Sequence, residues 1–396
     1  MVPKLRFPEF RNAGDWTTEK LGSLASISTE KVGNAACVPM SITSGVGLVS
    51  QEDKFGRVIA GDSYKNYLLL KPNDFAYNKS ATKEYPEGFL SLYSGSKLAA
   101  VPNSIFTCFR VNGESPVTTY LNYLFLGNLH GQWLQKFIQV GARAHGSLSI
   151  NDSDLMALPV PLPTGNSSVA EQQKIADCLS SLDELITAQA RKLDALKTHK
   201  KGLMQQLFPR DGETQPRLRF PEFREQWIES KLNDLCSSIS SGRDQLDSDG
   251  GFDLYGSTSV IGKTRTASFY GERILVARVG ANAGTLTKAN GAFGVTDNTL
   301  VVSPKQNISM DFLLHYLGSI NINKLIFGSG QPLITGSILK DLPILVPVDA
   351  EQQRVAVSVS SLDALIFAQD CDLETTKSHR NGLMQQLFPS SAEGEA

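Results

Sequence analysis

The hydrophobic pattern of this chain contains one long helical signature, and that signature occurs twice. Residues 170–209 and 350–389 align without a gap, and 24 of the 40 positions are identical. In both copies apolar residues recur at steps of four and three, which is the spacing of a long helix buried along one seam. Each copy predicts a helix of about 38 residues, on the order of 57 Å long at about 1.5 Å per residue. Two matched seams on one chain favour packing of the helices against each other.

The predicted core of this helix pair follows the seam through the middle of each copy. It comprises Leu182, Ile186, Gln189 and Leu193 in the first copy, and Leu362, Ile366, Gln369 and Leu373 in the second. A polar residue on an apolar seam costs stability but specifies the register of the pair. In an antiparallel pair of equal repeats, we therefore expect Gln189 and Gln369 in neighbouring layers near the centre. The alternative is that both glutamines are solvent-exposed where the seam frays.

The repeat extends beyond the helix. The motif LRFPEFR at residues 5–11 returns at 218–224, and a tryptophan follows each copy. Each half therefore consists of a short motif, a variable globular region and a long helix. The predicted organisation is a first globular region at 1–160, a helix at 168–209, a second globular region at 210–345, a helix at 348–389 and a flexible tail at 390–396.

The two globular regions, called heads below, differ in sequence but share their ends. Each begins with segments typical of strands and turns, such as SIFTCFRV from Ser104 and ERILVARVG from Glu272. Each has a late apolar helix signal that closes in Leu-Gly, at 120–127 and 310–318. Proline-rich connectors at 159–163 and 343–347 then lead into the long helices. The predicted fold class is α/β (α+β), with two heads and an antiparallel two-helix coiled coil related by a pseudo-twofold repeat.

Composition limits the possible functions. The chain has 396 residues and a formal net charge of -2, so it lacks the basic excess of a non-specific nucleic-acid coat, and any DNA contact must be local or shared with a partner. Its five cysteines form no C-x-x-C pair, which favours a reducing compartment. No apolar run approaches the roughly 18 residues of a membrane span, and the first residues lack a signal-peptide core. We expect a cytoplasmic protein without a membrane partner.

The sequence does not contain the motifs of a catalytic site. It has neither the Pro-Pro dipeptide of amino-methylating DNA methyltransferases nor the Pro-Asp dipeptide that opens a common nuclease carboxylate cluster. The run GSTSVIGKT at 256–264 resembles a phosphate loop, but its spacing is one residue too long, which favours a turn between strands. The five histidines show no metal-binding spacing. We expect no catalytic residues, no bound metal and no cofactor on this chain.

The doubled AEQQ…SSLD…GLMQQLFP helix, the doubled LRFPEF motif and the divergent heads together resemble the DNA specificity subunit of type I restriction-modification systems, over essentially the whole chain. The resemblance implies that each head is a target recognition domain for one half of a split sequence in double-stranded DNA. It also implies that the helices separate the heads and bind two DNA adenine methyltransferase subunits, joined by restriction subunits. S-adenosylmethionine, ATP and magnesium would belong to those partners.

Such a molecule would read a bipartite target. One turn of DNA spans about 34–36 Å, so heads held by rods on the order of 57 Å suit half-sites about one turn apart. Because the heads differ in sequence, the two half-sites should differ as well. The alternatives are a specificity partner of a related methylating nuclease outside type I and a coiled-coil scaffold whose heads bind proteins. A neighbouring reading frame that encodes an adenine methyltransferase would separate the two methylation readings from the scaffold.

Base reading needs polar side chains, and phosphate binding needs cations. In the second head, residues 256–296 contain five cations and the single acid Glu272. The candidates for DNA binding are Asn78, Lys79, Ser80, Lys83, Arg143, His145 and Ser147 in the first head, and Lys263, Arg265, Arg278, Lys288 and Gln331 in the second. The alternative for any one of them is an ordinary solvated loop. We expect replacement of Lys263 and Arg265 by alanine to abolish recognition of the second half-site.

Six apolar residues beside the seam are candidates for a second surface. They are Leu185, Met204 and Phe208, with Leu365, Met384 and Phe388 in the second copy. A twofold set of partners needs duplicated binding surfaces of this kind. The alternative is that the GLMQQLFP ends pack under LRFPEF, which would bring N-terminal and C-terminal segments together.

Overall fold

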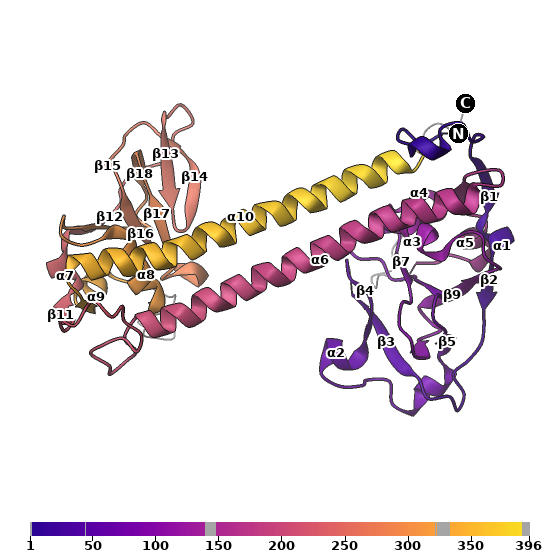
Figure 1. Cartoon of the computed structure of the whole chain (residues 1–396), viewed down its shortest axis with the longest axis horizontal. Coiled ribbons are helices and arrows are strands. Elements are labelled where there is room, and N and C mark those ends of the chain that lie inside the picture. The colour runs from indigo at the N-terminus through magenta and orange to yellow at the C-terminus, as the bar shows by residue number, and fades with distance from the viewer. Residues whose placement is uncertain (1, 44, 139–147, 321, 323–332, 390–396) are drawn as a thin grey trace. The chain divides into compact units, whose positions relative to one another are not determined.

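The protein is described by a computed structural model, which covers residues 2–43, 45–138, 148–320, 322 and 333–389. The chain divides into two compact units, each with sheets and helices (Figure 1). Unit 1 comprises Met1–Ala188 and Glu374–Ala396, and unit 2 comprises Gln189–Leu373. The predicted α+β class is confirmed. The cut falls inside the long helices, so each unit consists of one head and a part of both helices.

The two long helices form where the repeat predicts them. Helix α6 spans Ser168–Leu207, 40 residues, and α10 spans Asp349–Leu387, 39 residues. In unit 1 the start of α6 shares a buried core with the end of α10, through Ile175, Leu179 and Leu387 among others. In unit 2 the end of α6 shares a core with the start of α10, through Leu207 and Val359 among others. Within each unit, therefore, the helices run antiparallel.

Unit 1 contains two four-stranded sheets. One has the order β2-β9-β6-β7 and the other β4-β3-β8-β5. The strands are β2 (Ala25–Ser28), β3 (Val38–Thr43), β4 (Gly47–Ser50), β5 (Leu68–Leu70), β6 (Phe75–Asn78), β7 (Phe89–Leu92), β8 (Ala99–Val101) and β9 (Phe106–Val111). The pair β3 and β8 is parallel and the other named pairs are antiparallel.

Unit 2 repeats this arrangement strand for strand. Its sheets have the orders β12-β19-β16-β17 and β14-β13-β18-β15, and again only one named pair, β13 with β18, is parallel. The strands are β12 (Cys236–Ser241), β13 (Phe252–Gly256), β14 (Ser259–Thr264), β15 (Phe269–Tyr270), β16 (Arg273–Ala277), β17 (Leu286–Ala289), β18 (Ala292–Val295) and β19 (Thr299–Pro304). Two heads that differ in sequence therefore share one topology.

Each head is closed by an antiparallel pair of short strands at its boundary with the long helices. These pairs are β1 (Thr17–Lys20) with β10 (Pro159–Leu162) and β11 (Ile228–Lys231) with β20 (Pro343–Val346). The proline-rich connectors are thus edge strands, where a missing N–H group is tolerated. They bring the beginning and the end of each head together.

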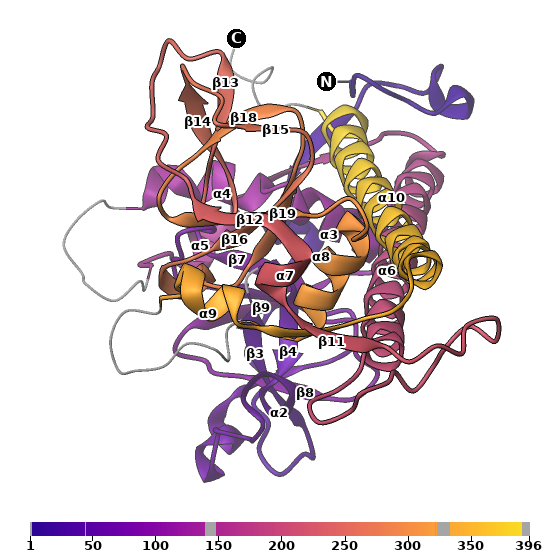
Figure 2. The same ribbon diagram turned by 90° about the vertical axis from the view of Figure 1, so that its left-hand side faces the viewer.

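The late helix signals form α3 (Thr118–Leu126) and α8 (Met310–Ser319). Figure 2 shows α8 between the strands of unit 2 and the long helices, and Phe312, Leu313 and Leu317 share the buried core with Val355 and Val359. The shorter helices are α1 (Leu21–Leu24), α2 (Gln51–Phe55), α4 (Leu129–Leu134), α5 (Asp152–Met156), α7 (Leu232–Leu235) and α9 (Gly336–Lys340), with 3-10 turns at Pro8–Phe10, Asp62–Asn66, Gln135–Phe137 and Gly280–Asn282.

Candidate nucleic-acid interface

Each head is tied to the start of its long helix by an arginine–glutamate pair from the repeated motifs. In unit 1, Arg6 Nε lies 2.7 Å from Glu171 Oε1, and both side chains are buried. Trp16 Nε1 donates a hydrogen bond to the same oxygen over 3.3 Å. In unit 2, Arg219 and Glu351 pair at 2.7 Å. The hydrogen bond to Glu171 raises the pKa of Arg6, so this guanidinium stays charged. The LRFPEF and AEQQ motifs thus form one joint.

The next residue of the AEQQ motif holds the late helix of each head. The N–H group of Val117 donates to Gln172 Oε1 over 2.8 Å, and the N–H group of Ser309 donates to Gln352 Oε1 over 2.9 Å. Val117 and Ser309 are the N-cap residues of α3 and α8. Free N–H groups at a helix start need acceptors, and here the acceptor comes from the long helix.

A third joint in unit 1 involves the repeated SSLD motif. The hydroxyl of Tyr123 donates to Asp183 Oδ2 over 2.7 Å, and its oxygen lies 3.2 Å from Ser180 Oγ. Arg380 Nε, from α10, lies 2.9 Å from Asp183 Oδ1. Burial raises the pKa of Tyr123 to about 12, which keeps the hydroxyl protonated. This aspartate therefore joins α3, α6 and α10 at one point.

The equivalent joint in unit 2 has a histidine in place of the tyrosine. A hydrogen bond of 3.0 Å joins His315 Nε2 and Ser360 Oγ, and His315 Nδ1 lies 3.9 Å from Asp363 Oδ2. Lys200 Nζ, from α6, lies 2.5 Å from Asp363 Oδ1. Burial lowers the pKa of His315. Asp183 and Asp363 are equivalent in the repeat, so the aspartate of this joint can be identified from the sequence. Tyr123 and His315 differ, so their part in the joint cannot.

The repeated GLMQQLFP ends lie against the LRFPEF motifs. The N–H group of Leu5 donates to Gln386 O over 2.9 Å, and that of Leu218 donates to Gln206 O over 3.0 Å. The prediction that N-terminal and C-terminal segments meet is confirmed in unit 1. The six apolar candidates separate accordingly. Met204, Phe208, Met384 and Phe388 pack into the cores of the two units, whereas Leu185 and Leu365 are 47% and 55% exposed.

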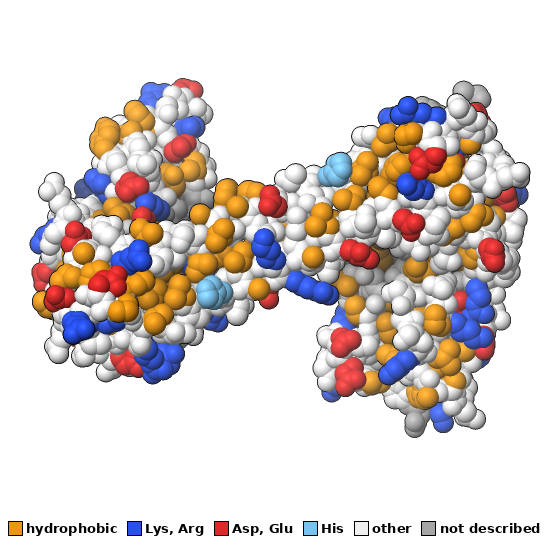
Figure 3. Space-filling view, in the orientation of Figure 1, with side chains coloured by type: hydrophobic (Ala, Val, Ile, Leu, Met, Phe, Trp, Pro, Cys, Tyr) orange, Lys and Arg blue, Asp and Glu red, His pale blue; other side chains and the backbone are white. Residues whose placement is uncertain are grey.

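The predicted DNA-binding cations of head 2 have carboxylate partners. Lys263 Nζ lies 2.7 Å from Asp253 on the adjacent strand, and Lys288 Nζ lies 2.7 Å from Asp311 and 3.1 Å from Glu272. Arg265 contacts two further aspartates, Asp247 at 2.8 Å and Asp249 at 3.2 Å. Figure 3 shows basic and acidic side chains interspersed in the same way. The basic excess counted along residues 256–296 is thus offset by acids that lie outside it in sequence.

Lys79 and Arg278 occupy equivalent positions in the two heads. Each directly follows an equivalent strand, β6 or β16. Their N–H groups donate to the residue just before β9 or β19, Ile105 O at 2.8 Å and Asn298 O at 2.9 Å. Their carbonyls accept from Leu148 N at 2.7 Å and Ile334 N at 2.8 Å. These two cations therefore lie at the same point of one shared frame.

Their side chains have different partners. Lys79 Nζ lies 3.3 Å from Asp152 Oδ1. The guanidinium of Arg278 donates to the carbonyls of Asp297 (3.0 Å) and Ile334 (3.4 Å), and it has no ion pair within the described ranges. Arg278 is therefore the predicted cation of head 2 whose charge is not offset by a carboxylate.

The remaining predicted residues of head 1 give a mixed result. Asn78 is buried and its Oδ1 accepts from the N–H group of Ser80 over 2.9 Å, so it shapes the turn after β6. Lys83 is exposed. Four predicted residues, Arg143, His145, Ser147 and Gln331, lie outside the described residues.

The predicted helix-pair residues are buried or half-buried. Leu193, Gln369 and Leu373 are buried, and Leu182, Ile186, Gln189, Leu362 and Ile366 are intermediate. The placement of Gln189 and Gln369 in neighbouring layers stays a prediction. Gln189 Oε1 is buried and has no hydrogen-bond partner in the part of the chain that the structure describes.

Among the described residues, no group of three or more His, Cys, Asp or Glu side chains could hold a metal ion. No described helix is long and apolar enough to cross a membrane.

Comparison with known families links this geometry to one class of protein. A family model described as the type I restriction modification DNA specificity domain matches residues 224–370. The chain is 29% identical over 114 residues to the specificity subunit of the type I restriction enzyme EcoprrI from Escherichia coli, a match that covers 29% of this chain and 28% of that subunit. It is 24% identical over 328 residues to the putative MjaX specificity subunit of Methanocaldococcus jannaschii. That match covers 76% of this chain and 74% of the MjaX subunit.

Solved structures share the fold. The S subunit of a type I restriction-modification system from M. genitalium superposes with a TM-score of 0.66 at 16% identity, over 98% of this chain and 100% of that one. A chain from a study of complex assembly and conformational transition of the type I system superposes with a TM-score of 0.57 at 16% identity, over 95% and 98%. At such identities the likeness concerns the fold of the two heads and the long helices.

Proposed function

We propose that the chain is a DNA specificity subunit of a type I restriction-modification system and acts as a non-catalytic reader of a bipartite DNA target. Each head contacts one half-site of a double-stranded target, and the long helices set the spacer between the half-sites. Methyltransferase and restriction subunits supply the chemistry, together with S-adenosylmethionine, ATP and magnesium.

The observation that carries this proposal is one strand topology in two heads of different sequence. A shared frame presents its loops at the same points, while different side chains on those loops contact different bases. Base edges in the major groove carry distinct donor and acceptor patterns, so a change of side chain changes the bases that fit. The target is therefore asymmetric rather than palindromic.

Lys79 and Arg278 are the residues that we assign to equivalent DNA contacts in the two heads. Arginine binds guanine O6 and N7 with two hydrogen bonds, whereas lysine provides a point charge. Arg278 lacks a carboxylate competitor among the described residues. Arg143, His145 and Gln331 are further candidates from the sequence. The surroundings of Arg278 favour base or phosphate contact over a purely structural role.

The exposed residues Leu185 and Leu365 are assigned to the methyltransferase subunits. They are equivalent in the repeat, large and apolar, and about half exposed. A pair of identical partners needs duplicated contact surfaces. The other residues of the repeat, such as Glu171 and Asp183, are already used in the joints between head and helix.

The test is a map of methylated adenines in cells that contain the chain and its methyltransferase partner. We expect Arg278→Ala to relax the second half-site at one position and Lys79→Ala to relax the first, each at a cost of about 1–3 kcal/mol in discrimination. Exposed Arg224→Ala in unit 2 and Lys97→Ala in unit 1 are controls that should leave the target unchanged.

The double variant Lys263→Ala/Arg265→Ala is measured in the same assay. It distinguishes DNA contact at β14 from DNA contact at Arg278. Loss of the second half-site in the double variant but not in Arg278→Ala would move the assignment to β14. Unaltered methylation in all of these variants would contradict the reading of DNA by these heads. Absence of methylation that depends on the wild-type chain would instead favour a protein-binding scaffold.

A further inference from the structure

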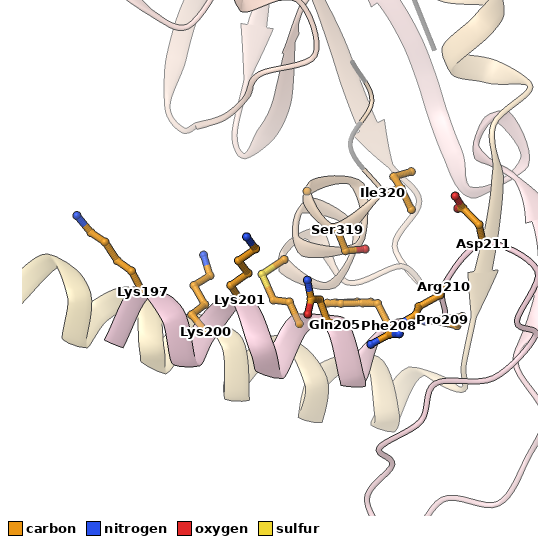
Figure 4. Close-up of a pocket in the computed structure, with 12 residues that line it drawn as sticks. Lys197, Lys200, Lys201, Gln205, Phe208, Pro209, Arg210, Asp211, Ser319 and Ile320 are labelled. Carbon is orange, nitrogen blue, oxygen red and sulfur yellow. The ribbon is translucent and has the colours of Figure 1, made fainter. Parts of the chain in front are cut away.

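A basic groove lies in unit 2 between the end of α6 and the end of α8. Its volume is about 590 Å³. The lining includes Lys197, Lys200 and Lys201 of α6, Arg210 just after that helix, and Ile320 after α8. Figure 4 shows the three lysines projecting from α6 on the side where the strands of the head lie. Phe208, buried beneath the cations, forms part of the floor.

The charge of this groove is compensated in part, because Glu213, whose pKa is lowered chiefly by its hydrogen bond from Arg217, also interacts with Arg210. Of the four cations, Lys200 is paired with Asp363 at 2.5 Å. Lys197, Lys201 and the Arg210 side chain have no ion pair within the part of the chain that is described, and the groove is lined by the single acid Asp211. The predicted DNA-binding cations Lys263, Arg265 and Lys288 all have carboxylate partners. Lys197, Lys201 and Arg210, like Arg278, are therefore cations of unit 2 without an ion pair among the described residues.

The repeat offers an internal comparison. Residues 191–201 of α6 contain five basic residues and one acid, whereas the equivalent residues 371–381 of α10 contain two of each. Lys201 corresponds to Asn381, and Arg210 corresponds to Ser390. Lys197 corresponds to Lys377, which is paired with Glu374 at 2.7 Å. The apolar frame of the groove is duplicated, but its charge is not.

Support of the helix end does not account for these cations. Basic residues stabilise a helix C-terminus mainly within its last turn. Helix α6 ends at Leu207, so Lys197 and Lys201 lie more than one turn before that end. Helix α10 ends at the equivalent Leu387 without comparable charge. The charge of α6 therefore indicates a binding role.

We propose that Lys197, Lys201 and Arg210 bind phosphates of the DNA duplex without reading its sequence. This inference rests on the proposed function and adds a contact outside the base-reading loops. Lysine acts on phosphate as a point charge, and phosphate contacts position a protein on the duplex without carrying sequence information. An acidic protein partner is disfavoured because two identical partner subunits would need this charge in both copies of the repeat.

The experiment measures the affinity of the full chain, assembled with its methyltransferase partner, for a duplex with both half-sites and for a random duplex across a salt series. The variant is Lys197→Gln/Lys201→Gln/Arg210→Gln. Each lost phosphate contact lowers the slope of log K against log salt by about 0.9. We expect the slope to fall by about 2 to 3, affinity at 0.1 M salt to fall on the order of tenfold to a hundredfold for both duplexes, and the ratio between them to stay the same.

The matched single variants are Lys197→Gln and its repeat equivalent Lys377→Gln, of which only the first should lower the slope. An unchanged slope in the triple variant overturns the proposal, and loss of the partner from the assembled complex with an unchanged slope assigns the groove to a protein. A collapse of the ratio between the two duplexes overturns its sequence-independent character. Absence of any target preference in the wild-type assembly would instead contradict the proposed function itself.

Discussion

Individual charged residues in this protein fall into classes that differ in burial. The pair Arg6–Glu171 is buried, Arg219–Glu351 is half-buried on the arginine side, and removal of one partner from a buried pair costs about 3–5 kcal/mol. The pair Lys263–Asp253 is exposed, and such pairs contribute about 0–1 kcal/mol. Exchange of that carboxylate for a DNA phosphate therefore costs little. The paired cations of head 2 remain candidates for DNA contact, whereas the buried pairs hold the fold.

His130 makes the stability of unit 1 depend on pH. Its ring is buried against Tyr77 and Phe125, and burial lowers the pKa of His130 to about 4, although the backbone of Gly88 and Phe125 acts in the opposite direction. The unfolded chain binds a proton below about pH 6.5, and the folded unit does so only near pH 4. The stability from neutral His130 is thus complete above about pH 6.5 and is lost as the pH falls toward 4.

We expect His130→Phe to reduce the loss of unfolding free energy between pH 7.5 and pH 4.5 by about 2–3 kcal/mol relative to the wild type. Urea unfolding at the two pH values measures this difference. His199→Gln, at an exposed position, is the matched control and should keep the wild-type pH dependence. Equal slopes for His130→Phe and the wild type would show that His130 is protonated in the folded unit.

At the scale of elements, the long helices combine an apolar seam with joints to the heads. Their shared residues have separate tasks: Glu171 and Asp183 bind the head, Leu193 packs in the seam, and Leu185 is exposed. The doubled motifs therefore reflect one joint built twice. Unit 2 has His315 where unit 1 has Tyr123. Both side chains contact the SSLD motif of a long helix, but only unit 2 has an imidazole at this joint.

Gln189 provides a test of the seam. Its buried Oε1 has no hydrogen-bond partner among the described residues, and an unsatisfied buried polar group costs about 1–3 kcal/mol. Gln189→Leu should therefore raise the free energy of unfolding by about 1–3 kcal/mol in urea titrations. Gln205→Leu, on an exposed position of the same helix, should give no comparable gain. A loss of stability in Gln189→Leu would mean that the glutamine is satisfied in the folded protein.

At the scale of the whole molecule, the two heads are one architecture with two sequences. Insertion of seven residues after Ala188 and after Ala368 would lengthen both helices by about 10 Å while keeping the phase of the seam. If the helices set the spacer as proposed, the spacer in the methylated target should grow by about three base pairs, since each base pair rises about 3.4 Å. The half-sites should not change.

Mapping of methylated adenines with the lengthened chain measures both quantities at once. Insertion of seven residues in α6 alone is the matched control, because it breaks the match between the two seams and should reduce methylation of any target. New half-site sequences with an unchanged spacer would contradict the role of the helices in setting the spacer.

The sequence by itself determined the features that repeat or follow a period: the two long helices, the joint motifs at each end, the late helices α3 and α8 and the order of elements in each half. These features depend on residue spacing and on identity between the two copies, and both can be read from the sequence alone. The sequence did not predict that the two heads share one topology, because equivalent strands such as β6 and β16 have the same pairing but different side chains.

Tertiary structure alone decided the charge of the candidate surface. The partners of Arg265 and Lys288 include Asp247, Asp249 and Asp311, which lie outside the counted stretch and come near only when the sheets and α8 form. Coulomb interactions depend on distance in space and not on separation along the chain. For the same reason, only the folded structure shows that Lys197 and Lys201 have no ion pair among the described residues, whereas Lys200 between them is paired with Asp363.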